Sequence, residues 1–221
     1  MKGVLILFIT LTFFYNKSVY GQNDDSLFSR LRGVSNNGAT YFNVDGVEIS
    51  MQTSAIDFTK SNILKHYKRY SIKESDLNVT DSLVVQPNFY VFKSKETSNG
   101  IVENASYYFI QQPNKGLLFI IFTSLNKKDR SFERHFVHLI QNNAIPDSVF
   151  ESLQIDSINF AGRKIKLGGS CHWMGVNNVQ CPSYGQMNWS MNKSLVDAAT
   201  EVNNQYLVIK DKKQGRVVSE E

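Results

Sequence analysis

The alternation of apolar and polar positions predicts a β-hairpin near the start of the chain. The segment TYFNVDGVEISMQT, residues 40–53, places β-forming residues on both sides of Asp45-Gly46. Two-residue hairpin turns need positive φ angles, which glycine adopts without steric cost, so we expect the turn at Asp45-Gly46. Apolar residues then recur at helical spacing and predict an amphipathic helix over about residues 55–70. These apolar residues are Ile56, Ile63, Tyr67 and Tyr70.

Three strongly β-forming segments follow, at residues 88–96, 101–112 and 116–124. The turn signals Ser98-Asn99-Gly100 and Pro113-Asn114-Lys115-Gly116 separate them, which predicts an antiparallel meander. The near-continuous apolar run Leu117–Phe122 is typical of a central strand that is covered on both faces, with Ile120 in the core.

The remaining pattern mixes helices and strands. Asp129 is a candidate N-cap for a second helix with Phe132, Phe136, Leu139 and Ile140 on one face. Residues 156–167 predict a hairpin about Ala161-Gly162, leading into a cysteine-containing loop. Leu195, Val196, Ala199 and Val202 favour a third helix, and Tyr206–Ile209 a final strand, which could form a last hairpin with residues 215–219.

These elements predict an α+β fold. We expect a mainly antiparallel sheet, made of the 88–124 meander and the hairpins, with two or three helices packed on one face. No internal repeat or linker divides the chain, so residues 22–221 are expected to form a single domain. Because the sequence ends abruptly, an abbreviated member of a longer type of protein also fits.

The N-terminus has the features of a signal peptide over residues 1–21. Met1-Lys2 precedes an uncharged, largely apolar run from Gly3 to Tyr15, and Val19 and Gly21 place small residues before Gln22. The run is too short to span a bilayer as a helix, and no later segment is long and apolar enough to do so. We therefore expect an exported protein, periplasmic or secreted, with no transmembrane segment after cleavage. The alternative is that the N-terminal segment stays uncleaved as an anchor.

Charge gives little support to nucleic-acid binding. The formal net charge is +4 for the whole chain. Removing Lys2 and Lys17 with the signal peptide lowers it to +2, and the basic residues form no extended cluster. No nucleic-acid partner is expected.

Both cysteines lie in GGSCHWMGVNNVQC, residues 168–181, and this segment has three interpretations. GGSCHW resembles the cysteine-protease segment C-G-S-C-[WY], but Gly168 stands in place of the first cysteine, His172 intervenes before Trp173, and no histidine follows. A different Cys-His enzyme could use His66, His135 or His138 from upstream. Cys171, His172, Met174 and Cys181 include soft metal ligands, and His135 and His138 could offer two imidazoles one helical turn apart, yet neither spacing repeats a zinc pattern. A disulfide between Cys171 and Cys181 fits an oxidising compartment and a short loop best, so it is the expected state.

The same segment and its continuation interleave aromatic and amide side chains. Rings supply contact area at low entropic cost and amides supply hydrogen bonds, a combination that suits a sugar- or peptide-binding surface. The other interpretation is that the tryptophans fill the core of an irregular segment. The candidate binding residues are Trp173, Met174, Asn177, Tyr184 and Trp189.

The sequence indicates only a general class of function. The motifs of nucleotide-binding loops, zinc proteases and α/β-hydrolases do not occur. We expect a non-enzymatic binding or support module of the envelope or extracellular space, whose partner is a protein or polymer of the cell envelope. No catalytic residue, metal ligand or cofactor is assigned. The alternative is a small exported hydrolase with an unrecognised active site.

The signal pattern predicts where the exported chain begins. Its intact mass should correspond to a start at Gln22, with or without cyclisation to pyroglutamate, because Val19 and Gly21 suit the −3 and −1 positions of a cleavage site. Mass spectrometry of protein recovered from outside the cytoplasm measures this directly. Recovery of only the full-length chain, in the cytoplasm, would contradict the prediction.

Overall fold

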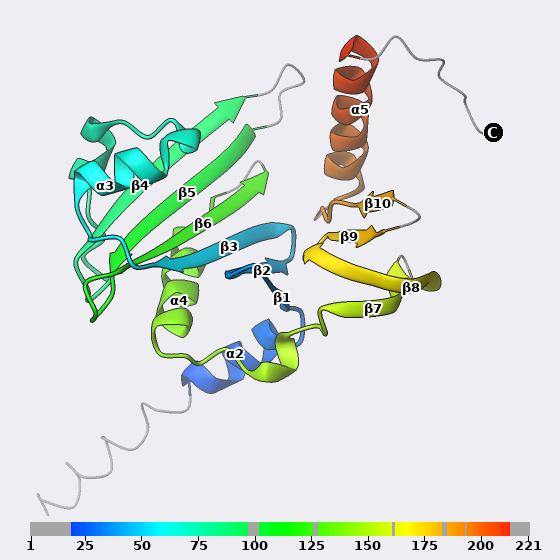
Figure 1. The fold of residues 1–221 in the computed structure, drawn as a ribbon, viewed down its shortest axis with the longest axis horizontal. Helices are drawn as coiled ribbons and strands as arrows, with labels where there is room; N and C mark the ends of the chain where they lie inside the picture. The colour runs from blue at the N-terminus through cyan, green and yellow to red at the C-terminus, as the bar shows by residue number, and fades with distance from the viewer. Residues whose placement is uncertain are drawn as a thin grey trace, which may run out of the picture.

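Two antiparallel sheets and four α-helices make up the part of the chain that the structure, a computed structural model, describes (Figure 1). The described residues are 19–96, 102–125, 128–160, 162–182, 185–192 and 194–212. The helices are α2 (Val19–Phe28), α3 (Lys60–His66), α4 (Arg130–Gln141) and α5 (Leu195–Lys212). Three short 3₁₀ helices are η2 (Lys68–Tyr70), η3 (Glu74–Asn78) and η4 (Asp147–Val149).

The large sheet has six strands in the order β1-β2-β3-β6-β5-β4. They are β1 (Arg32–Asn36), β2 (Ala39–Val44), β3 (Val47–Ser54), β4 (Asn88–Glu96), β5 (Val102–Gln111) and β6 (Leu117–Leu125). The small sheet has the order β10-β9-β8-β7. Its strands are β7 (Gln154–Phe160), β8 (Arg163–Gly175), β9 (Asn178–Cys181) and β10 (Gly185–Asn188).

The α+β class and the mainly antiparallel sheet are confirmed. The predicted hairpin is β2–β3, and its turn residues Asp45 and Gly46 have φ angles of 50° and 81°. The meander is β4–β5–β6, and β5 and β6 pair antiparallel as expected. Ile120 on β6 is fully buried. The predicted turn at residues 98–100 lies outside the described residues.

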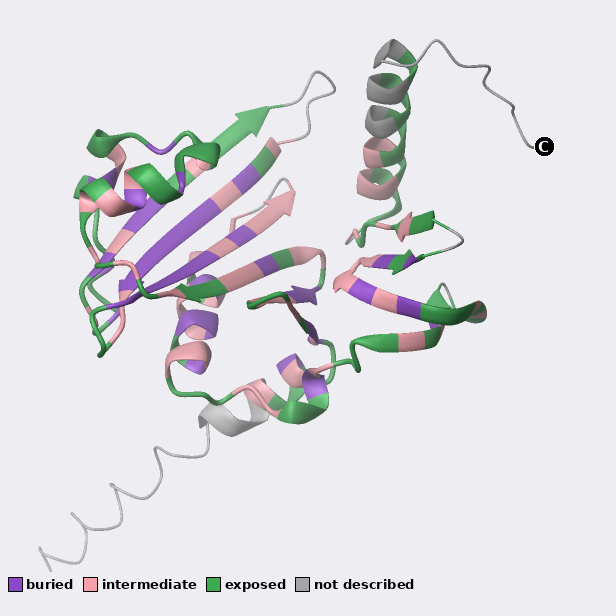
Figure 2. Cartoon of the chain, in the orientation of Figure 1, coloured by how far each residue is buried: buried purple, intermediate pink, exposed green. Residues whose placement is uncertain are grey.

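Helices cover both faces of the large sheet, as the buried stripes along β5 and β6 in Figure 2 indicate. On one face, Tyr108 and Ile120 pack with Phe136 of α4 and Leu27 of α2. On the other face, Phe109, Phe119 and the neighbouring apolar residues pack with Ile63 of α3. The expectation of helices on one face therefore holds for α2 and α4, whereas α3 covers the opposite face.

Several helix boundaries differ from the predicted ones. The helix expected over 55–70 begins at Lys60, because the Thr59 hydroxyl accepts the Asn62 backbone N–H at 3.2 Å and caps the helix there. It breaks after His66 into η2. The second helix begins after Asp129, whose carboxylate accepts the Phe132 N–H at 3.0 Å, as predicted. Helix α2 was not predicted.

The predicted strand at Tyr206–Ile209 is wrong. These residues belong to α5, which continues the predicted third helix to Lys212. Tyr206 follows Val202 at helical spacing and no glycine or proline intervenes, so nothing in the sequence stops the helix before this short β-forming run. The predicted last hairpin is wrong as well, because its first segment is helical. Its second segment, residues 215–219, lies outside the described residues.

Most of the predicted signal peptide, residues 1–18, also lies outside the described part of the chain. Helix α2 begins at Val19 and runs across the predicted cleavage site after Gly21. Within the described residues, no helix has both the length and the apolar character needed to cross a bilayer.

The small sheet packs against the β1–β2 end of the large sheet. Trp173 and Val179 of the small sheet share a buried cluster with Val34 of β1, and Tyr41 of β2 borders it. The Asn36 side chain donates a hydrogen bond to the Trp173 carbonyl at 3.0 Å. Apolar packing and this hydrogen bond together fix the small sheet on the large one.

A buried ionic cluster ties the 79–88 loop to α4. The carboxylate of Asp81, a residue only 2% exposed, accepts hydrogen bonds from Arg130 at 2.5 Å and from Arg134 at 2.9 Å. Arg130 also donates to Glu133 at 3.1 Å, and its guanidinium stacks on the Tyr90 ring at 3.2 Å. Buried charges are stable only when they are paired, and here each carboxylate has a cationic partner.

Burial by itself raises the pKa of Asp81, but the hydrogen bond from Arg134, the Leu83 backbone N–H and the charge of Arg130 together lower it below the ordinary value. A carboxylate whose pKa is lower in the folded state stabilises the fold above its unfolded-state pKa of about 3.9. That stabilisation is lost as the pH falls through the lower, folded-state pKa.

We therefore predict that Asp81→Asn lowers the free energy of unfolding by roughly 3 kcal/mol at neutral pH, because it leaves two arginines without their carboxylate. The difference from the parent should shrink in acid, as the parent's own Asp81 becomes protonated. Urea unfolding at neutral pH and near pH 3 measures both effects. Asp147→Asn, at an exposed position on η4, is the control and should change neither. Parallel acid destabilisation of parent and Asp81→Asn would contradict the prediction.

Candidate functional site

The candidate site is a cleft between the two sheets, on the face of the large sheet that carries α3. Strand register places Tyr41, Ser50 and Ile121 side by side across β2, β3 and β6. Ile121 packs with the cluster under α3, and Tyr41 packs with the small sheet. Ser50 lies on the large-sheet surface between α3 and the small sheet. The next residues along the strands on the same face are Glu48 of β3 and Thr123 of β6, which pair with each other.

Both sheets contribute side chains to this junction cleft, which has a volume of about 390 Å³. The large sheet contributes Tyr41, Glu48, Ser50 and Thr123. The small sheet contributes Asn177, Asn178, Asn188 and Trp189. The volume lies in the range of small-ligand sites, and the lining combines aromatic rings with hydrogen-bonding groups.

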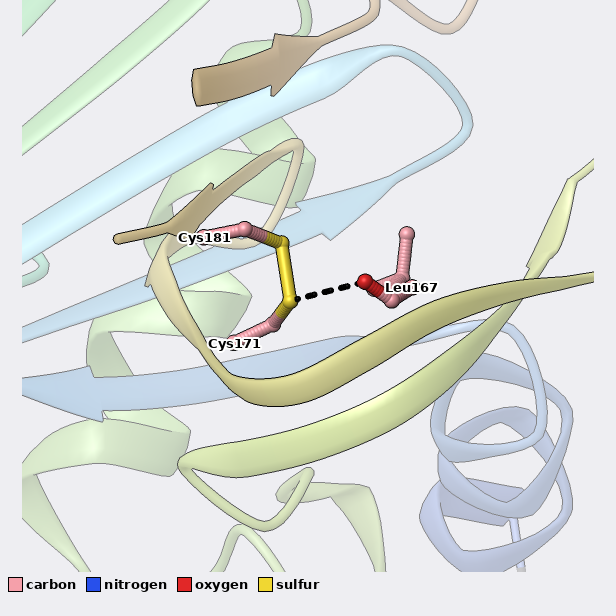
Figure 3. The surroundings of a disulfide bond; sticks show 3 residues. All are labelled: Leu167, Cys171 and Cys181. Carbon is pink, nitrogen blue, oxygen red and sulfur yellow. Dashed lines mark hydrogen bonds between the residues drawn. A yellow bond between two sulfur atoms is a disulfide. The ribbon is translucent and has the colours of Figure 1, made fainter. Parts of the chain in front are cut away.

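The disulfide fixes the strand pair that forms the small-sheet wall (Figure 3). Cys171 and Cys181 are bonded, as predicted, with their Cα atoms 4.2 Å apart. His172 pairs with Gln180, so the two cysteines lie directly opposite one another on β8 and β9. The Cys171 sulfur lies 3.4 Å from the Leu167 carbonyl oxygen. Because a bonded sulfur carries no proton, this is a close polar contact and not a hydrogen bond.

The cysteine segment is not a loop, as the sequence led us to expect, but two strands joined at Val176-Asn177. A bulge in β8 precedes it: Ile155 pairs with Cys171 but Ser157 pairs with Lys166, so residues 167–170 face a single residue of β7. Gly168 in this bulge has a φ of 85°, which favours glycine. The bulge shifts the register between β7 and β8, whereas the pairing of β8 with β9 sets Cys171 opposite Cys181.

Trp189, which lines the cleft, is held in place by other rings. It meets Trp173 edge to face at 5.7 Å between centroids, and Phe160 at 5.9 Å. Its backbone N–H donates to the Asn177 carbonyl at 3.1 Å. These contacts orient a half-buried indole toward the cleft that it lines.

A polar bridge joins the two walls. The Asn177 side-chain N–H donates to the Glu48 carboxylate at 3.0 Å. The side-chain oxygen of Asn177 is buried without a hydrogen-bond partner, and so is the side-chain nitrogen of Asn43, which is the cross-strand neighbour of Glu48. Buried unpaired polar atoms are costly, and their occurrence beside one carboxylate is typical of a functional region.

The five candidate binding residues lie in different places. Asn177 and Trp189 line the junction cleft. Trp173 is 3% exposed and fills the core beneath Trp189, as the alternative interpretation of the tryptophans has it. Met174 is half-buried next to Asn36 and is not part of the lining. Tyr184 lies outside the described residues.

Sequence reasoning missed the large-sheet half of the cleft. Glu48 and Ser50 alternate with apolar residues on β3. This pattern indicates that both side chains face outward, but it does not indicate which residues they contact. Only the pairing of β3 with β6 and the docking of the small sheet bring them close to Asn177. No local signal in the sequence contains that information.

The structure gives no support to the reactive-cysteine interpretation or to the metal-site interpretation of the cysteine segment. Both cysteines are consumed in the disulfide, so Cys171 has no thiolate to act as a nucleophile or ligand. His135 is hydrogen-bonded to Asp24 at 2.6 Å, and His138 is exposed on the same helix. The described residues contain no group of three or more histidine, cysteine or acidic side chains arranged to hold a metal ion.

A second hollow, of about 540 Å³, lies at the β8 bulge and is lined in part by Gly168, Gly169 and Trp173. Two of its charged side chains, Arg32 and Glu151, are hydrogen-bonded to each other at 2.6 Å. They satisfy one another, although the hollow also has the exposed carboxylate of Asp156. Its tryptophan, Trp173, is only 3% exposed, whereas the junction cleft is lined by the half-buried Trp189 together with a carboxylate and amides. The junction cleft is therefore the stronger candidate.

Comparison with known proteins finds no matching family model, no matching curated protein and no matching solved structure.

The disulfide predicts both a thiol count and a stability change. The native protein should contain no titratable thiol, and the free energy of unfolding of the double variant Cys171→Ser/Cys181→Ser should fall by about 2–3 kcal/mol, which lowers Tm by roughly 5–10 °C. Thermal unfolding and thiol titration under alkylating conditions measure these. The reduced parent protein is the matched control, because it loses the cross-link with no change of side chain. One reactive sulfur per chain in the native protein would contradict the prediction.

Proposed function

We propose that the protein is an exported, non-enzymatic binding module that holds its ligand in the junction cleft. The observation that carries this proposal is the convergence of the Trp189 ring, three asparagine amides and the Glu48 carboxylate from two separate sheets. A ligand that fills such a cleft contacts both sheets at once, which gives shape as well as chemical selectivity.

Export is supported by chemistry as well as by the N-terminal pattern. A structural disulfide persists in an oxidising compartment and is rare in the cytosol. The Cys171–Cys181 bond fits a protein of the periplasm or the extracellular space. The ligand is accordingly expected to be a protein or polymer of the cell envelope, or a fragment of one.

A photo-crosslinking experiment tests the binding function while the ligand is still unidentified. Asn188, an exposed residue at the cleft, is replaced by p-benzoylphenylalanine in the purified mature chain, which is irradiated with envelope material from the source cells. The comparison variant places the same group at Asn159, an exposed asparagine on β7 that lines the second hollow, so labelling there reports binding at that competing site.

The expected result is a covalent adduct at position 188, detected by mass spectrometry, and little or none at position 159. Adding Trp189→Ala should reduce the adduct about tenfold, because buried aromatic contacts dominate binding energies. Equal labelling at both positions, or none at position 188, would refute a binding role for the cleft.

A further inference from the structure

We propose that the ligand of the junction cleft is a neutral saccharide of about two or three sugar units, sized to a small-ligand cleft. This inference rests on the proposed binding function and specifies the chemistry of its ligand. Three features carry it: the charge of the lining, the Trp189 ring in the lining, and the pairing on both sides of the strands that carry most of the lining.

Charge selects against anions. Glu48 is the charged side chain in the described lining, and it is exposed to the cleft. Arg32 of β1 is in register with Glu48 of β3, with Asn43 of β2 between them, and its side chain is hydrogen-bonded to Glu151. A single carboxylate therefore dominates the local potential and repels phosphates, carboxylates and sulfates. Neutral hydroxyl groups can instead donate charge-assisted hydrogen bonds to it.

The ring and the amides suit a sugar. One face of a pyranose presents C–H groups and packs on an indole, which supplies a rigid apolar surface. Trp189 is oriented by Trp173 and Phe160 before any ligand arrives, so little conformational entropy is lost on binding. The Gln186 side-chain N–H donates to the side-chain oxygens of Asn178 and Asn188, so these two residues offer a ligand mainly their amide N–H donors, which a hydroxyl oxygen can accept.

Peptides commonly bind by adding a strand to an open sheet edge. The strands β2, β3, β6 and β9, which carry most of the lining, are each paired on both sides. Their backbone donors and acceptors are already used in the sheets. The cleft therefore recognises its ligand through side chains, as small polyhydroxylated ligands require.

The test is a binding screen of the mature protein. The probes are neutral di- and trisaccharides of glucose, xylose, mannose, galactose and N-acetylglucosamine, with galacturonic-acid and sulfated oligosaccharides and lysine-containing tripeptides as competing classes. Calorimetry gives Kd, and Trp189 fluorescence reports occupancy of the cleft. Kd for a neutral sugar should hold constant between about 50 and 500 mM NaCl, because no ion pair forms.

Variants locate the binding. Trp189→Ala should weaken the neutral sugar at least about tenfold, and Glu48→Gln about tenfold, because the charge-assisted hydrogen bonds are lost. Glu74→Gln, an exposed glutamate on η3, is the matched control and should change nothing. Trp189→Phe keeps a ring at the cleft, so it guards against loss of binding through misfolding: it should bind within about threefold while losing the fluorescence change.

Each outcome decides a different point. A neutral saccharide that binds and responds to these variants supports the inference. An acidic sugar or a peptide that binds and responds to them overturns the ligand class but leaves the binding function standing. If no probe responds to the variants while the crosslinker at position 188 captures a protein, the saccharide is wrong and the binding function stands. If that crosslinker captures nothing as well, both fail.

Discussion

The pairing of β3 with β6 is the interaction on which the rest of the molecule depends. It joins the β1–β3 meander to the β4–β6 meander in one sheet, through residue pairs that range from Ser54 and Leu117 to Glu48 and Thr123 and are far apart in the sequence. Its register decides which side chains share a face. Because Ser50 lies opposite Ile121 and Glu48 opposite Thr123, a polar strip borders the apolar surface under α3. A shift by one residue would bury Glu48 and expose Ile49, at a cost that the core could not offset.

The same pairing shows where sequence reasoning succeeds and where it stops. Hairpins and the meander were predictable because turn chemistry and alternation are local, as at Asp45-Gly46 and Pro113–Gly116. The disulfide was predictable from compartment and spacing. The cysteine segment was misread as a loop, although Cys171 and Trp173 alternate with half-buried neighbours, because its glycines and asparagines suggested irregular structure. The final strand was misread because a β-forming tetrapeptide at the end of a helix follows the helix when no breaker intervenes.

The cleft could be only half predicted for a physical reason. Asn177 and Trp189 are close in sequence to the cysteines and could be singled out from composition. Glu48, Ser50 and Thr123 come from interior strands whose only local signal is outward-facing polarity. What unites the two groups is the packing of Trp173 and Val179 against Val34, a contact between segments more than 130 residues apart. Such a contact depends on the tertiary fold and leaves no trace in any local window.

The disulfide and the tryptophan pair give the cleft its rigidity, and rigidity is what a small polar ligand requires. A ligand of this size makes few contacts, so any ordering of the protein on binding subtracts directly from its affinity. The bond between Cys171 and Cys181 holds β8 against β9, and the β8–β9 turn presents Asn177. The backbone of Trp189 is hydrogen-bonded to that same turn, and its ring rests on Trp173. The cross-link therefore stabilises the fold and also presets the positions of two cleft residues, which a free loop with the same side chains would have to order at the expense of binding energy.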